Sequence, residues 1–211
     1  MPSFFLISPW GAIFWLVASL VSLTVHEFGH ALAAYILGDQ RPKNDGRLSL
    51  LPFSHIDPLG LLLLLLFGVG WAKPVKFDPT SLRYPGFGST LVALAGPLAN
   101  LIILVVVIFA GKFVVAWTGL PLALNVSLFL QSFILINALF LVTNLIPLPP
   151  FDGSKLVLDL LQKFNSLKIA NFLMKNGQYI FIGILIVDNF VFNGVLMNKL
   201  FSAVFWFYKF I

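Results

Sequence analysis

The sequence contains no cysteine and very little charge. Without cysteine it can form neither a disulfide framework nor a thiolate metal site, so a metal ion would need His, Asp or Glu ligands. Charged residues make up only 10% of the 211 positions, against roughly 25% in soluble domains, whereas hydrophobic residues make up 59%. A chain of this size could not hide so much apolar surface in one water-soluble core. The composition therefore predicts a single integral-membrane domain over residues 1–211.

Two further absences exclude other classes of protein. The net charge is +5, but the basic residues are scattered through predicted loops, and no basic stripe is interleaved with exposed aromatics. Nucleic acid is therefore not expected as a partner. The first ten residues lack the basic stretch that begins a secretory signal peptide, so we expect no cleaved leader.

Four long apolar runs predict membrane-spanning helices. A helix needs about 20 apolar residues to cross a hydrocarbon core of about 30 Å, and each run has that length. The sequence thus predicts an all-α polytopic membrane protein. The predicted spans are Trp10–Leu37, Ser89–Gly111, Ala123–Ile146 and Gly177–Asn198.

The segments between these runs have other patterns. Residues 38–58 are polar and punctuated by proline and glycine, which predicts a loop with short strands. Residues 59–71 are strongly apolar but too short to cross, so we expect a re-entrant or interfacial segment. Lysines alternate with apolar positions over residues 151–176, which predicts an amphipathic helix at the membrane surface. Residues 201–211 are too short to span alone, and the sequence does not place them.

The distribution of positive charge supports this topology, because cytoplasmic loops carry an excess of Lys and Arg. If the segment 59–71 does not cross and the first span ends in the cytoplasm, ten basic residues lie on that side and two or three on the other. If the segment were a full span, the lysines of Lys155–Lys175 would move outside and the bias would collapse. The first set is Arg41, Lys43, Arg47, Lys73, Lys76, Arg83, Lys155, Lys163, Lys168 and Lys175; the second is Lys112 and Lys199, with Lys209 unplaced.

The first predicted span carries the motif HExxH, from His26 through Glu27 to His30. Helix positions i and i+4 share a face, so both imidazoles can reach one metal ion, and the glutamate can act as general base on water. A lone histidine in an apolar helix is usually a hydrogen-bonded packing residue. Three ionisable groups within about one turn each cost about 2.5 kcal/mol or more to bury in a membrane, and metal binding offsets that cost. The motif therefore predicts a metal site with Glu27 as the catalytic residue.

A catalytic zinc site usually has three protein ligands and one open position. Asp152 is the best candidate for the third, because prolines break the chain just after the third span and the predicted topology returns it to the side of the two histidines. The alternative for Asp152 is a cap of the following helix. His55 and Asp57, in the polar segment after the first span, are the rival ligands.

Three polar side chains in the later spans need partners in an apolar environment. Asn100 ends the segment GPLAN of residues 96–100, whose small residues allow close helix contact, and Asn144 lies near the end of the third span. Either amide could form an interhelical hydrogen bond or hold the substrate carbonyl and the developing oxyanion, and the two interpretations are nearly balanced. Asp188 is interpreted as a helix-end or partner residue.

The motifs at residues 26–30, 96–100 and 144–153, in that order, together resemble the site-2 protease family of intramembrane metalloproteases. HExxH alone is shared with many soluble zincins, and its combination with an Asp-Gly pair after a later span is much more specific. Residues 55–60 and 70–75 resemble elements of the small bacterial members. The resemblance extends over roughly residues 15–155.

This resemblance implies a three-helix catalytic core over about residues 10–155, with further C-terminal helices over about 155–211. It implies membrane-associated strands within residues 40–75, near the site. Phe151 stands where the family often has another residue. No PDZ-like or CBS-like domain fits into 211 residues, so we expect a minimal form with a different regulation.

The resemblance also implies one zinc ion per chain, bound by His26, His30 and Asp152, with Glu27 as the base. The predicted function is hydrolysis of peptide bonds within or next to transmembrane segments, in a prokaryotic cell membrane and nearer its cytoplasmic side. A substrate helix must unwind locally, and a strand edge within Arg47–Phe53 could hold it by strand addition.

Two alternatives belong beside this prediction. One is a membrane zincin with its motif in a soluble domain, which the apolar residues on both sides of the motif disfavour. The other is a membrane metal carrier or an inactive scaffold of the same fold. The expected partners are the lipid bilayer and a membrane protein with a transmembrane segment; the substrate, its cleavage site and the oligomeric state are not predicted.

Overall fold

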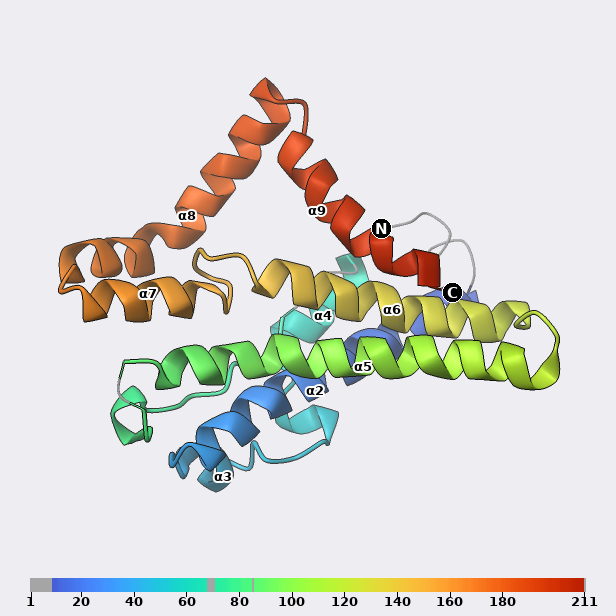
Figure 1. Cartoon of the computed structure of the whole chain (residues 1–211), viewed down its shortest axis with the longest axis horizontal. Helices are drawn as coiled ribbons and strands as arrows, with labels where there is room; N and C mark the ends of the chain where they lie inside the picture. The colour runs from blue at the N-terminus through green and yellow to red at the C-terminus, as the bar shows by residue number, and fades with distance from the viewer. Residues whose placement is uncertain (1–8, 68–70, 85, 211) are drawn as a thin grey trace.

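A computed structural model describes residues 9–67, 71–84 and 86–210 of this chain. The expectation about a leader, and Gly70 of the 70–75 element, fall outside these ranges. Within these ranges, four helices are long and apolar enough to cross a membrane, which confirms the all-α polytopic fold (Figure 1). They are α2 (Pro9–Ile36), α5 (Gly88–Thr118), α6 (Leu124–Asn144) and α8 (Leu167–Val191).

Helices α2, α5 and α6 pack against one another over much of their lengths and form a three-helix core (Figure 1). Small residues allow the close approach of α2 and α5, because a Cβ added to Gly29 would lie 2.6 Å from the carbonyl oxygen of Ala95. Leu104 of α5 and Ile134 and Ala138 of α6 are buried between the helices. The core therefore places α2, which carries HExxH, against both other spans.

Helix α5 extends seven residues beyond its predicted end at Gly111. It ends at Thr118, where Gly119 adopts a left-handed conformation with φ of 65° and donates its N–H to the carbonyl of Val115. Glycine takes this conformation without steric cost, so it stops the helix there.

The strands expected within residues 38–58 and 40–75 do not form, and that prediction is wrong. In the described ranges, β pairing is limited to one isolated antiparallel bridge, between Ile56 and Ala72. The loop instead contains a helical turn, α3 (Arg41–Asn44), and a 3-10 turn, η1 (Pro52–Ser54).

Side chains take the place of a strand ladder in this loop. The Arg47 guanidinium donates to the carbonyl oxygens of Ser54 at 2.7 Å and Lys73 at 3.1 Å. Asp39 accepts hydrogen bonds from the backbone N–H groups of Arg41 at 3.0 Å and Asp78 at 2.5 Å. Arg47–Phe53 contains no strand, so the predicted strand addition has no strand edge there.

Helix α4 (Pro58–Phe67) has ten residues and is therefore about 15 Å long, half of the hydrocarbon thickness. This length agrees with the prediction that the apolar segment does not cross the membrane alone. Leu62, Leu65 and Leu66 are exposed on its outer side.

The C-terminal boundaries differ from their predictions. The expected surface helix over 151–176 is divided into α7 (Ser154–Lys163) and the first part of α8, because the chain turns at Asn165 with φ of 55°. The fourth span therefore begins at Leu167 instead of Gly177. Positive φ is tolerated by Asn and Gly, so hydropathy alone does not reveal such turns.

A second turn reverses the chain after α8. Asn193 and Gly194 have φ of 52° and 73°, and α9 (Val195–Trp206) and η3 (Phe207–Phe210) return toward the bundle. In Figure 1, α8 and α9 stand off from the core as an inverted V. Asp188 accepts hydrogen bonds from the N–H groups of Leu196 at 2.8 Å and Met197 at 3.1 Å, which confirms its interpretation as a helix-end residue.

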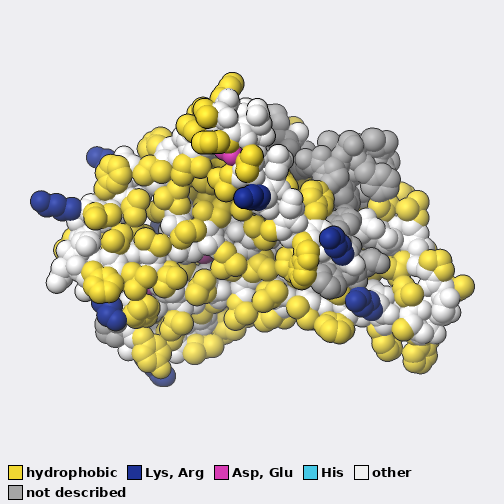
Figure 2. All heavy atoms as spheres, turned by 45° about the horizontal axis from the view of Figure 1, so that its top comes forward, with side chains coloured by type: hydrophobic (Ala, Val, Ile, Leu, Met, Phe, Trp, Pro, Cys, Tyr) yellow, Lys and Arg dark blue, Asp and Glu magenta, His cyan; other side chains and the backbone are white. Residues whose placement is uncertain are grey.

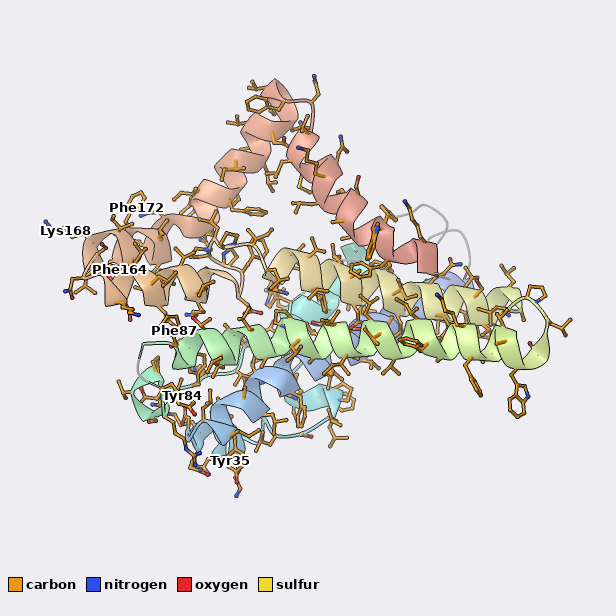
Figure 3. All side chains as sticks on the ribbon, in the orientation of Figure 1. Tyr35, Tyr84, Phe87, Phe164, Lys168 and Phe172 are labelled. Atoms are coloured by element: carbon orange, nitrogen blue, oxygen red, sulfur yellow. The ribbon has the colours of Figure 1, made fainter. Side chains whose placement is uncertain are left out.

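Aromatic residues gather at one end of the molecule, where α2 ends and α5 and α8 begin (Figure 3). Lysines accompany them: the Nζ atoms of Lys43 and Lys163 lie 5.4 Å from the ring centroids of Tyr35 and Phe87. Aromatic and basic residues of this kind mark a membrane–water boundary. Figure 2 shows a largely apolar surface on which a few basic side chains are scattered, some at its edges and some within the face. The labelled members in Figure 3 are Tyr35, Tyr84, Phe87, Phe164, Lys168 and Phe172.

Candidate metal centre

Three buried ligand atoms from two distant segments meet beside α2. The Nε2 atoms of His26 and His30 are 3.0 Å apart, and Asp152 Oδ2 lies 3.1 Å from the first and 3.3 Å from the second. These separations match the edge of about 3.3 Å of a tetrahedron whose ligand bonds are about 2.0–2.1 Å. Asp152 Oδ2 is buried and makes no well-aligned hydrogen bond with any described residue. The donor atoms therefore fit a zinc ion without rearrangement.

Asp152 reaches this position because the chain turns sharply after α6. The N–H of Gly153 donates to the carbonyl of Asn144 at 2.7 Å, which closes the turn, and α7 begins at the next residue. Asp152 Oδ2 has no hydrogen-bond partner among the described residues, and no side-chain hydrogen bond caps α7, so the alternative role of Asp152 as a helix cap has no support.

Both histidines are oriented by contacts to their other ring nitrogen. His26 Nδ1 donates to Asn100 Oδ1 at 2.6 Å, and His30 Nδ1 donates to the carbonyl of Val92 at 2.8 Å. Each Nδ1 faces an oxygen acceptor, and when Nδ1 carries the proton, Nε2 keeps the lone pair that a metal ion binds. This is the arrangement that orients metal-binding imidazoles.

Asn100 belongs to a buried network that joins α2, α5 and α6. Its Nδ2 donates to Asn137 Oδ1 at 2.9 Å and to the carbonyl of Ser22 at 3.2 Å, and Asn137 Nδ2 donates to Ser22 Oγ at 2.8 Å. Asn100 is fully buried and both ends of its amide are engaged. The structure therefore supports the interhelical hydrogen bond for Asn100 and leaves its amide no free polar atom for an oxyanion.

Asn137 was not predicted, although its signal equals that of Asn100: a single amide inside an apolar run. The contact of His30 with the Val92 carbonyl could not be predicted from the sequence, because every residue has a carbonyl group and only helix packing determines which one the ring meets.

Glu27 is buried and faces an extended stretch of chain. Its Oε2 accepts a hydrogen bond of 3.1 Å from the backbone N–H of Val75. The residues around Val75, from Trp71 to Phe77, contain no helix or strand. This segment therefore lies across the metal centre and holds the carboxylate from the side opposite α2.

The metal centre opens into a cavity of about 560 Å³. Asn144 and Lys155 face it beside Asp152, and the described structure gives the Asn144 side chain no hydrogen-bond partner. Asn144 is thus available to a bound substrate, whereas Asn100 is not. Lys155 was predicted only as a surface residue. The other walls include Leu23, Glu27, Trp71, Pro74, Val75, Phe77, Ala93, Phe140, Thr143 and Phe151.

His55 and Asp57 do not line this cavity. The His55 ring contacts the carbonyl of Ser49 through Nε2 at 2.7 Å. Asp57 Oδ1 accepts hydrogen bonds from the N–H groups of Leu59 at 3.0 Å and Gly60 at 2.9 Å, and so caps α4. The rival ligand interpretation therefore receives no support from the geometry.

The charge state of Asp152 suits a cation site. Burial alone would raise the pKa of its carboxyl group, but the neighbouring imidazoles of His26 and His30 outweigh burial and hold the pKa well below its usual range. The carboxylate is therefore ionised at neutral pH and can bind a metal ion without losing a proton first.

Comparison with known proteins identifies relatives of this chain. Residues 114–187 match peptidase family M50. Over 161 residues, 74% of this chain and 73% of the relative, it is 38% identical to "Putative zinc metalloprotease YwhC" of Bacillus subtilis. Over 202 residues, 90% of this chain and 71% of the relative, it is 30% identical to "Putative zinc metalloprotease Rip2" of Mycolicibacterium smegmatis. No solved structure matches the chain significantly.

Proposed function

The chain belongs to peptidase family M50 and is a multi-pass membrane metalloprotease, and from this premise we propose that it hydrolyses peptide bonds within or next to the transmembrane segments of membrane proteins. The depth of the candidate metal centre carries this proposal. Tyr35, at the aromatic end of α2, is nine residues beyond His26 and five beyond His30. At 1.5 Å per residue these histidines lie about 14 and 8 Å along the helix from the boundary, within the hydrocarbon region.

In this proposal His26 Nε2, His30 Nε2 and Asp152 Oδ2 hold one zinc ion per chain. When bound, the ion supplies the Lewis acidity that activates water and the scissile carbonyl. Glu27 takes the proton of the attacking water and passes it to the leaving amine. The Val75 N–H, 3.1 Å from Glu27 Oε2, keeps this carboxylate directed into the cavity.

Asn144 is proposed to stabilise the oxyanion. It lines the same cavity as Asp152, and its amide has no partner in the described structure. A preorganised donor in a site of low dielectric stabilises the developing charge in the transition state.

The proposed substrate is a transmembrane segment that unwinds locally, because a helix hides its amide groups in internal hydrogen bonds. The active site is proposed to lie nearer the cytoplasmic face of a prokaryotic membrane, since Lys43, Lys163 and Lys168 lie among the aromatic residues at that end. The lipid bilayer is the proposed surrounding of the spans.

Metal analysis combined with cleavage of a transmembrane peptide tests this function. Glu27→Gln should keep zinc and lose cleavage, and Asp152→Ala should lose both. Asp45→Ala, an exposed aspartate in the loop after α2, is the matched control and should change neither. Zinc at full occupancy in Asp152→Ala would refute the third ligand. A metal carrier, in contrast, would keep its transport activity in Glu27→Gln.

A further inference from the structure

A second cavity lies beside the metal centre, between α2, α4 and α6. It has a volume of about 100 Å³ and almost entirely apolar walls. Two leucines of α4 face it, while their neighbours Leu62 and Leu65 are exposed on the outer side of the same helix. Residues on the cavity walls include Ser19, Leu23, Leu61, Leu64, Trp71 and Phe140.

The second cavity and the cavity of the metal centre are neighbours and share part of their walls. Leu23, Trp71 and Phe140 line both of them. Leu23 is one helical turn before Glu27, and the Phe140 ring lies 6.0 Å from the His26 ring, centroid to centroid. A peptide whose scissile bond lies at Glu27 would therefore present an adjacent side chain to this second cavity.

We propose that the cavity is a specificity subsite that receives one aliphatic side chain, of the size of valine or leucine, from the substrate residue next to the scissile bond. This inference rests on the proposed function. A cavity of about 150 Å³ lined by apolar side chains holds a benzene molecule, so one of about 100 Å³ suits a smaller aliphatic group and excludes an aromatic ring.

An unpaired polar atom in the wall points to a peptide occupant. Ser19 is only 4% exposed, and its Oγ has no hydrogen-bond partner in the part of the chain that the structure describes. Buried hydroxyl groups are normally paired. An unwound substrate carries free backbone N–H and C=O groups, which a lipid acyl chain lacks, so the substrate can satisfy Ser19 while its side chain fills the apolar space.

Helix α4 makes the width of this subsite adjustable. Within the described ranges it takes no part in the extensive packing that joins α2, α5 and α6. The width of the cavity between α4 and the core is therefore set by the leucine side chains of α4 and not by close backbone contact between helices. Substitutions at Leu61 and Leu64 should change the subsite and leave the three-helix core intact.

The experiment uses transmembrane peptides that differ only at the residue next to the scissile bond, with Ala, Leu or Phe there; mass spectrometry of the wild-type products locates the bond. Wild type should prefer Leu. Leu64→Ala should raise the cleavage of Phe relative to Leu by about tenfold or more, since one methylene in an apolar pocket changes selectivity by roughly 10–200-fold. Leu64→Trp should lower the cleavage rate of the Leu peptide and leave that of the Ala peptide unchanged. Leu65→Ala and Leu65→Trp are the matched controls and should behave as wild type.

A binding measurement supports the same assignment without catalysis. Glu27→Gln, with a photoreactive leucine at that peptide position, should crosslink to α4 at Leu61 or Leu64, and Leu64→Trp should abolish this crosslink. Leu61→Ala provides a second widened variant if Leu64→Trp fails to fold, as judged by its zinc content.

The outcomes separate the two proposals. If wild type cleaves but the Phe-to-Leu ratio is the same in Leu64→Ala and Leu61→Ala, the subsite is refuted and the proposed function stands. If Leu64→Trp slows all three peptides equally and Leu65→Trp does not, the cavity supports the fold or holds a lipid chain, and the subsite is again refuted. If zinc-loaded wild type cleaves no peptide, the proposed function is refuted, and the subsite that rests on it is refuted with it.

Discussion

Asp159 of α7 accepts two hydrogen bonds from Thr90 at the start of α5, one from its backbone N–H at 2.9 Å and one from its hydroxyl at 2.7 Å. Both residues are buried. The N–H groups in the first turn of a helix have no partner within it, so a carboxylate from another helix caps α5 here. Since Asp152 lies just before α7, this contact also fixes the third candidate ligand relative to the histidines.

Asp159→Ala should therefore weaken both the fold and the metal centre. Loss of a hydrogen bond to a buried charge costs about 1.5–3 kcal/mol, and the Thr90 N–H would be left without a partner. We expect a lower melting temperature and a lower zinc affinity, measured by thermal unfolding and metal titration. Asp45→Ala should change neither, and unaltered zinc affinity in Asp159→Ala would show that α7 is held by other contacts.

Local spacing explains which parts of the site the sequence could predict. His26 and His30 are one helical turn apart, so a helix alone brings their side chains to one face. Asp152 is more than 120 residues away, and its candidacy depended on counting spans and on the bias of positive charge. The structure brings it within 3.3 Å of both Nε2 atoms. The predicted topology and the Asp-Gly motif together therefore predicted this long-range contact, which the helical spacing of HExxH alone could not.

Features that depend on turns and on backbone contacts were missed. Hydropathy cannot detect that Asn165, Asn193 and Gly194 adopt positive φ. The last span therefore begins ten residues before its predicted start at Gly177 and ends at Val191 instead of Asn198. The expected loop strands do not form, and the Arg47 guanidinium, in place of a strand partner, donates to the carbonyl groups of Ser54 and Lys73. The contact of Glu27 with Val75 involves a backbone N–H, which every residue except proline has, so the sequence contains no sign of it.

Asn137→Leu should lower zinc affinity although it touches no candidate ligand. The substitution leaves Asn100 Nδ2 without one of its acceptors and Ser22 Oγ without its donor, so the contact of Asn100 to His26 loses its support. Loss of a residue that orients a metal ligand typically costs 10–100-fold in affinity or activity. Excess zinc should restore cleavage if the effect lies in binding.

The control for this variant is Asn176→Leu on α8, where the amide bonds only to a carbonyl of its own helix. Equal zinc affinities in Asn137→Leu and Asn176→Leu would show that the hydrogen-bond network of Asn100 and Asn137 does not contribute to zinc binding.

Gly96→Ala should abolish zinc binding. A Cβ at this position would overlap the imidazole of His30 and lie 2.8 Å from Cε1 of His26, so both rings would have to move. Gly183→Ala is the matched control, because a Cβ on Gly183 meets no atom within 4 Å and alanine favours the helix. Metal analysis of the purified proteins measures the difference. Zinc bound normally by Gly96→Ala would mean that the histidines are not held against α5 as described.

Val75→Pro should reduce cleavage while leaving the zinc content unchanged. Proline has no N–H, so Oε2 of Glu27 would lose its 3.1 Å hydrogen bond, and the carboxylate could turn away from the attacking water. A hydrogen bond to a charged group contributes about 1.5–3 kcal/mol, which corresponds to a loss in kcat of roughly 10–100-fold. Val75→Ala keeps the N–H and should remain close to wild type. If both variants lose activity equally, the Val75 side chain matters as a wall of the cavity, and the backbone does not position the base. If only Val75→Pro loses kcat and it still binds zinc, the backbone of the extended segment holds the Glu27 carboxylate in its catalytic position.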